Sequence, residues 1–201
     1  MQSSEGYARF CSAGSYGEIA CKHLATMEQC LKDIVDISKG EELDFDDFDG
    51  PIQEVLALEK SCSEAAAIAI VFAGMAVEAY IYDYSARNLG DKFTKDHLDS
   101  LSVQNKWVLI PRLITGTDFP KDRAAFSLLN KLVKSRNNLV HSKSKAVCQT
   151  DLASGEIEKR QNAIYSNARD AVRALRELAD QIKLLDPNEL AHLNLGAKTR
   201  P

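Results

Sequence analysis

The stretch AAAIAIVFAGMAVEAYI, residues 65–81, is the most apolar part of this 201-residue sequence. It is rich in alanine and carries one charged side chain, Glu78. A membrane-spanning helix needs about 20 predominantly apolar residues, whereas this stretch is shorter and contains a carboxylate. It therefore predicts a helix in the core of a cytoplasmic protein that has no membrane partner.

Apolar residues on both sides of this stretch recur with helical spacing, and no run alternates in the way that predicts a β-strand. We expect an all-α fold, an up-and-down bundle of four to five main helices plus short helices. Residues 15–186 form the predicted single domain, between a flexible N-terminus (1–14) and a flexible C-terminal tail (187–201). The expected helices cover residues 15–39, 51–88, 94–100, 103–114, 123–140 and 156–185.

Individual residues mark several of these helix ends. Ser15, with Glu18 three residues later, fits a capping box, and Gly40 is expected to end the first helix. Pro111 is expected to bend or end its helix, because proline cannot donate a backbone hydrogen bond. Trp107 is expected to anchor the core rather than to stack on a ligand.

Cysteine, histidine and acidic residues predict neither a metal site nor a cofactor site. The five cysteines form no CxxC pair, which is typical of free thiols in a reducing compartment, and we expect small buried side chains. The histidines other than His141 lack metal-ligand spacing, and no P-loop or GxGxxG is present. The acidic run EELDFDDFD (41–49) does not fit the ligand positions of an EF-hand. We interpret it as a solvated linker.

Charge is distributed unevenly along the chain. Residues 103–145 hold nine basic and two acidic residues, although the formal net charge of the whole chain is −4. A local positive surface is suited to a polyanion, because contacts with phosphates release counterions. The alternative is that these basic residues pair with the acidic remainder of the same chain or of a neighbouring one.

The stretch KSRNNLVHSKSK, residues 134–145, places Arg136 on the apolar face of a predicted helix, in register with Leu129 and Leu132. A guanidinium on such a face is costly unless it is paired, or unless the face lines a cleft or an interface. His141 would point about 140° away from Arg136 in a straight helix. The two side chains would meet only if the helix yields between them, or if two chains contribute to one site.

Arginine, carboxamide and histidine together suit the cleavage of RNA without a metal ion. Histidine can take or give a proton near neutral pH, and arginine can stabilise charge that grows on a phosphate. Asn137 can orient either group while a 2′-hydroxyl attacks the adjacent phosphate. Because this spacing is common in helices, a helical scaffold in which Arg136 and His141 are satisfied in the core stays open as an alternative.

The segment RNNLVH (136–141) resembles the R-x4-6-H motif of the HEPN superfamily, the small helical-bundle domains of bacterial defence, toxin and RNA-processing systems. KWVLIPRLITG (106–116), FP (119–120) and AVEAYIYDY (76–84) add to a resemblance that spans about residues 65–145. It implies a face-to-face homodimer in which two copies of the motif line one cleft. It also implies a metal-independent endoribonuclease, which would act in phage defence or as a toxin.

Carried over by position, the resemblance makes Arg136 the residue that stabilises the phosphate, Asn137 the orienting residue and His141 the general acid or base. From their charge and their place beside the motif, the predicted RNA contacts are Lys134, Lys143 and Lys145.

Glu78 is predicted to support this site, because a carboxylate in the most apolar helix needs a partner. We expect it to pair with Arg136 and to position or restrain it. The alternative is a glutamate that faces water at the helix margin. For the whole protein, the alternative function is a non-catalytic HEPN-like module that binds nucleic acid, a nucleotide or a protein, such as a cognate antitoxin or a regulator.

Overall fold

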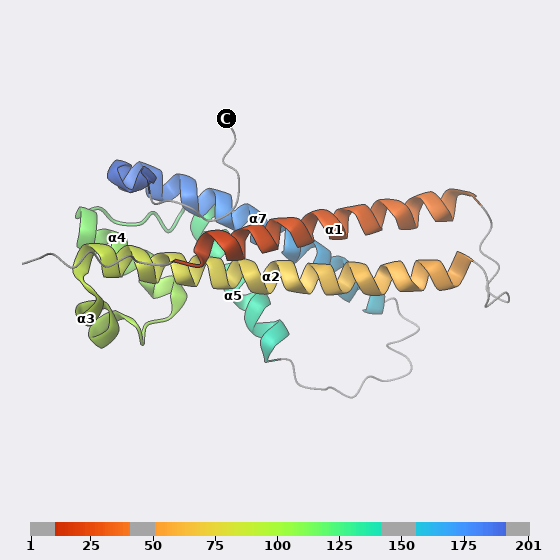
Figure 1. The fold of residues 1–201 in the computed structure, drawn as a ribbon, viewed down its shortest axis with the longest axis horizontal. Coiled ribbons are helices and arrows are strands. Elements are labelled where there is room, and N and C mark those ends of the chain that lie inside the picture. Colours follow the sequence, from red (N-terminus) through yellow and green to blue (C-terminus); the bar gives the residue numbers. More distant parts are fainter. Residues whose placement is uncertain (1–10, 41–50, 142–155, 192–201) are drawn as a thin grey trace, which may run out of the picture.

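The computed structural model describes residues 11–40, 51–141 and 156–191, and the regular structure in this part of the chain is entirely helical (Figure 1). This confirms the all-α fold class. The elements are α1 (Ala13–Gly40), α2 (Pro51–Leu89), α3 (Asp91–Phe93), η1 (Thr94–Leu98), α4 (Val103–Thr115), α5 (Ala124–Val140), α7 (Glu156–Leu185) and η2 (Pro187–Ala191).

Helix α2 is the centre of the bundle, since it packs against α1, α4, α5 and α7. Figure 1 shows α1 and α2 running side by side in opposite directions, with α5 leaving α2 on the other side. Fully buried alanines recur along α2, and their small side chains let neighbouring helices approach closely: Ala66, Ala69, Ala73 and Ala76.

Trp107 of α4 anchors the core, as the sequence predicts. Its side chain is fully buried, and its Nε1–H donates to the backbone oxygen of Val77 at 3.2 Å. Its ring lies 5.8 Å from that of Tyr80 and 6.1 Å from that of Phe119. A buried indole needs such a partner for its N–H, so this contact fixes α4 on α2.

The apolar character of α2 is also sufficient, by length and composition, for a membrane span over Ile52–Leu89. However, 56% of its most apolar window is buried inside the protein, and the core helix of a soluble protein meets the same criteria. This is weak evidence for a membrane, and the cytoplasmic location stays a prediction.

Several predicted helix ends are corrected by the structure. α1 begins at Ala13, because the backbone N–H of Tyr16 donates to Ser12 O at 3.0 Å, so Ser15 lies inside the helix and is not its cap. The predicted end at Gly40 is confirmed, because Gly40 is the last residue of α1. Pro111 lies within α4, which continues to Thr115 and ends at Gly116 with a positive φ of 75°.

The predicted flexible tail begins too early at 187. Residues 187–191 form η2, in which the side chain of Glu189 is only 3% exposed. Glu189 accepts hydrogen bonds from both terminal nitrogens of Arg87 and, at 3.0 Å, from the hydroxyl of Tyr80. The hydroxyl of Tyr84 donates to Asp186 at 2.8 Å. Burial and these carboxylates raise the pKa of both tyrosines.

The cysteines fit their prediction only in part. Cys30 and Cys62 are buried, Cys21 is half-buried and Cys11 is exposed. Burial raises the pKa of the Cys62 thiol, which is consistent with a structural role. Cys11 contradicts the expectation of burial, because it precedes α1 and is not covered by the core. Cys148 and the acidic run 41–49 lie outside the described residues.

Candidate active site

Arg136 lies on α5 where this helix packs on α2, and a glycine makes room for it. A Cβ atom added to Gly74 of α2 would lie 3.1 Å from Cγ and 3.4 Å from Cβ of Arg136. The arginine stem therefore runs directly over the α2 backbone. Its side chain is 32% exposed, as expected of an arginine on an apolar helix face whose head reaches the surface.

The three nitrogens of the Arg136 guanidinium have different surroundings. Nη1 donates to Oδ1 of Asn137 at 3.2 Å, and Nη2 lies 3.9 Å from Oε2 of Glu78. Nε is buried and has no hydrogen-bond partner among the described residues. The two terminal nitrogens of the guanidinium thus have polar neighbours, whereas Nε lacks a hydrogen bond within the described residues.

The predicted contact between Glu78 and Arg136 is present. It is at the outer limit of an ion pair, and the Glu78 side chain is 44% exposed, so this carboxylate also faces water. A pair that is this open to solvent contributes about 0–1 kcal/mol to stability. It therefore contributes little to holding α2 and α5 together, and the positioning of Arg136 by Glu78 stays a prediction.

His141 caps the C-terminal end of α5 with an exposed side chain. Its backbone N–H donates to the oxygen of Asn137 at 2.9 Å, so helical hydrogen bonding continues up to the histidine. The helix does not yield between Arg136 and His141, and the divergence expected from helical geometry holds within one chain. Convergence on one site then requires a second chain, which stays a prediction.

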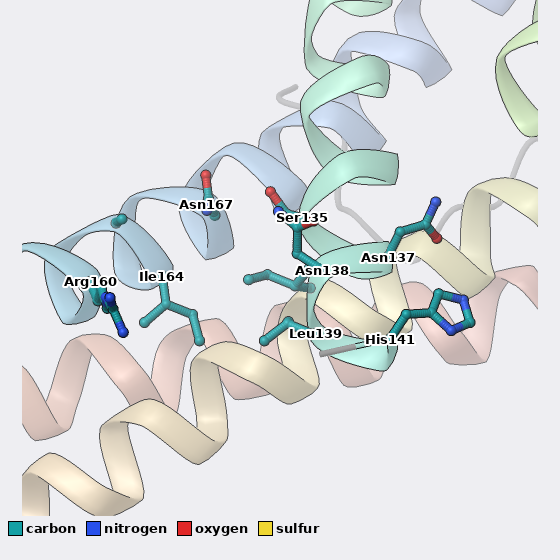
Figure 2. Close-up of a pocket in the computed structure, with 10 residues that line it drawn as sticks. Ser135, Asn137, Asn138, Leu139, His141, Arg160, Ile164 and Asn167 are labelled. Atoms are coloured by element: carbon teal, nitrogen blue, oxygen red, sulfur yellow. The ribbon is translucent and has the colours of Figure 1, made fainter. Parts of the chain in front are cut away.

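Asn137 connects the two diverging residues. Figure 2 shows Asn137 and His141 on the same side of α5, away from α7, while Ser135 and Leu139 lie toward α7. Residues four apart on a helix are neighbours, with Cβ atoms about 5–6 Å apart. Asn137 thus lies one turn before His141, and its side-chain oxygen accepts a hydrogen bond from Arg136.

Arg136 and His141 line different cavities. A cavity of about 870 Å³ lies between α2, α5 and α7, and its rim includes Asn137 and His141. A second cavity, of about 510 Å³, is lined by Arg136 together with three carboxylates and one lysine: Glu78, Asp83, Asp99 and Lys106.

Much of the local positive charge is neutralised within the chain. Lys106 is buried and pairs with Asp99 at 3.4 Å. Two further pairs join Arg112 to Asp118 at 2.7 Å and Lys131 to Asp170 at 3.3 Å. Asp99 and Asp170 lie outside residues 103–145, so pairing with the acidic remainder of the chain is confirmed for Lys106 and Lys131.

Three cations of the basic region remain exposed without an ion pair to the described residues: Lys121, Arg123 and Lys134. Lys134 lies three residues before Asn137 and seven before His141, which puts it on their side of α5. Lys143 and Lys145 lie outside the described residues.

No group of three or more histidine, cysteine or acidic side chains suited to a metal ion occurs in the described part of the chain.

Sequence reasoning missed Gly74, Asn138, Arg160 and Asn167, which surround the motif in space. Gly74 carries a signal, as the one glycine in the apolar stretch 65–81, and Asn138 is part of the RNNLVH segment. Arg160 and Asn167 lie on α7 and carry no signal of their own. Comparison of the chain with protein-family models, curated proteins and solved structures gives no match.

Proposed function

We propose that this protein is a metal-independent endoribonuclease of the HEPN type. The main support is the row of Arg136, Asn137 and His141 at the end of α5. Arg136 donates to the Asn137 carboxamide at 3.2 Å, and the backbone of His141 donates to that of Asn137 at 2.9 Å. A cation, an orienting amide and an exposed imidazole are thereby held on one rigid element.

In the proposed reaction, His141 takes the proton of a ribose 2′-hydroxyl as its oxygen attacks the adjacent phosphorus. The bond from phosphorus to the 5′ oxygen breaks, and the leaving oxygen receives a proton from an imidazolium. The products are a 2′,3′-cyclic phosphate and a 5′-hydroxyl. Arg136 stabilises the charge on the phosphate oxygens in the transition state, and Asn137 holds the guanidinium in place.

The proposed enzyme is a homodimer with composite sites. Arg136 and His141 of one chain diverge, so Arg136 of one protomer would act with His141 of its partner. Val140, which is 51% exposed beside His141, offers apolar surface for such an interface. The same geometry explains why an arginine occupies an otherwise apolar helix face.

The first test incubates the purified protein with total RNA in EDTA and identifies the ends of the products. The wild type is expected to leave 2′,3′-cyclic phosphate ends, and His141→Ala and Arg136→Ala are expected to leave RNA intact. His97→Ala is the matched control, because His97 is exposed on η1 and packs on Phe93 at a ring distance of 4.9 Å. Cleavage that persists in His141→Ala would overturn the proposed mechanism.

A second test separates composite sites from sites within one chain. Arg136→Ala and His141→Ala proteins are unfolded together and refolded as a mixture. If sites are composite, heterodimers contain one intact pair and cleavage returns. If each site lies within one chain, the mixture stays inactive, and the dimeric mechanism is wrong.

The alternative function is a non-catalytic binding module. Glu78 favours it, because this carboxylate lies 3.9 Å from the guanidinium of Arg136 and competes with a phosphate for the same cation. This alternative predicts RNA that is bound but not cleaved by a dimer of wild-type stability. A toxin or defence role predicts, in addition, growth arrest on expression of the wild type but not of His141→Ala.

A further inference from the structure

The cavity between α5 and α7 is lined in part by Asn137 and His141, but the rest of its lining has no role in the proposed chemistry. It has a volume of about 870 Å³, within the range typical of small-molecule sites. Figure 2 shows it between the C-terminal end of α5 and the N-terminal half of α7, with His141 at the far side of α5. Because Asn137 and His141 also line this cavity, a ligand group in it would lie close to the proposed general acid or base.

The walls of this α5–α7 cavity combine apolar surface with unpaired amides. Aliphatic side chains line one part of it, and Ser135, Asn138 and Asn167 line another. The side chains of these three polar residues have no hydrogen-bond partner in the described part of the chain. The apolar lining residues are Ile70, Leu139, Ala163 and Ile164.

Charge separates this cavity from its neighbour. The described lining of the α5–α7 cavity includes Arg160 and no carboxylate, whereas the cavity beside Arg136 includes three carboxylates. The neighbouring cavity also holds the cations Arg136 and Lys106, and in the α5–α7 cavity Arg160 attracts an anionic strand. Arg160 is exposed on α7, so it can approach a phosphate without being desolvated.

A carboxamide presents one acceptor and two donors in a plane, which matches the edge of an unpaired base. Asparagine pairs with adenine through two hydrogen bonds, to N6 and N7. Sequence-specific proteins read RNA mainly through such unstacked bases in single strands. The aliphatic walls suit the flat faces of the same base.

We propose that the α5–α7 cavity binds one unpaired adenine of single-stranded RNA, next to the phosphate that is cleaved. Asn138 and Asn167 read the edge of the base, and Arg160 contacts a phosphate of the same strand. The placement of this adenine next to the cleaved phosphate rests on the proposed function, whereas the binding of adenine in the cavity is independent of it.

The test uses tetranucleotides whose riboses carry 2′-O-methyl groups, because these cannot attack the phosphate and stay intact. The fluorescence anisotropy of labelled A, C and U tetranucleotides is measured with the wild-type protein. We expect the A tetranucleotide to bind most tightly. Asn138→Ala and Asn167→Ala are each expected to weaken its binding by about tenfold, and to change the binding of C and U little.

Asn130→Ala and Asn162→Ala are the matched controls, because both side chains are exposed on the same two helices and do not line the cavity. Each variant is used only if its melting temperature equals that of the wild type. Arg160→Ala is expected to weaken the binding of all three tetranucleotides equally, because a phosphate contact does not depend on the base.

The outcomes distinguish this inference from the proposed function. Selective binding of A that is lost in Asn138→Ala, without cleavage of total RNA, supports the adenine site and refutes the nuclease. Cleavage of RNA with equal binding of A, C and U, or with wild-type binding by both asparagine variants, overturns the adenine site and leaves the nuclease standing. The absence of any binding also overturns the adenine site.

Discussion

Replacing Gly74 by alanine tests the close approach of α5 to α2. Two effects oppose each other. Alanine is favoured over glycine inside a helix by about 1 kcal/mol, but the new methyl would lie 3.1 Å from Cγ of Arg136. This is closer than normal carbon–carbon contact, and relieving such overpacking costs about 1–3 kcal/mol. We therefore expect Gly74→Ala to lower the free energy of unfolding by about 0–2 kcal/mol.

A double-mutant cycle isolates the contact. Arg136→Ala removes Cγ and leaves only the contact to Cβ at 3.4 Å. In that background, Gly74→Ala is expected to stabilise the protein by up to about 1 kcal/mol. The coupling between the two positions should then be about 1–3 kcal/mol, measured by urea unfolding followed by circular dichroism.

A coupling below about 0.5 kcal/mol, the level at which independent sites add, would refute this reasoning. The same holds if Gly74→Ala stabilises both backgrounds equally. Either result would mean that the Arg136 stem does not lie on the α2 backbone, and that α5 is held at its depth by other contacts.

Three further predictions concern charged and phenolic groups in the bundle. Glu189→Ala leaves the partly buried Arg87 without its main partner and should lower the free energy of unfolding in urea by about 3 kcal/mol. Burial raises the pKa of Tyr80 above its usual value of 10. The neutral hydroxyl therefore contributes to folding stability below about pH 10, and this contribution is lost at higher pH. Tyr80→Phe should then flatten the alkaline fall in urea midpoint. A hydrogen bond from Arg169 lowers the pKa of Glu28. The ionised Glu28 therefore contributes under about 1 kcal/mol to stability at this exposed site, and this contribution is lost as pH falls below about 4.5. Glu28→Gln should remove this part of the acid dependence of the urea midpoint.

Long periodic segments explain which helices were predictable. α7 (Glu156–Leu185) matches its predicted range, because Gly155 and Pro187 punctuate a clear apolar stripe. After Gly90 the sequence predicts one short helix over 94–100, whereas the structure has α3 directly after the glycine and η1 from Thr94 to Leu98. Local hydrogen bonds at such short ends are nearly equal in energy, so the sequence pattern does not decide between them.

The C-terminal boundary was wrong for a different reason. Glu189 looks solvent-exposed in sequence, since charged residues are rarely buried. It is buried because Arg87 and Tyr80, about a hundred residues earlier, provide its partners. Periodicity describes one helix at a time and carries no information on such pairs.

The site was predictable along α5 and not across helices. Helical geometry alone places Arg136 and His141 about 140° apart, and this holds because α5 keeps its hydrogen bonds up to residue 141. The α5–α7 cavity depends on how two helices far apart in sequence face each other. Asn167 and Arg160 therefore had no recognisable role before the fold was known.

Gly74 links the fold of the core to the candidate site. It lies within the apolar stretch that decides the fold, yet the group packed on it is Arg136, the cation of the candidate site. A larger residue there would move the guanidinium away from Asn137 and Glu78, because the contact is with the base of the arginine side chain and not with its flexible end. The core helix thus sets the depth of α5, and with it the position of the charge that the proposed reaction needs.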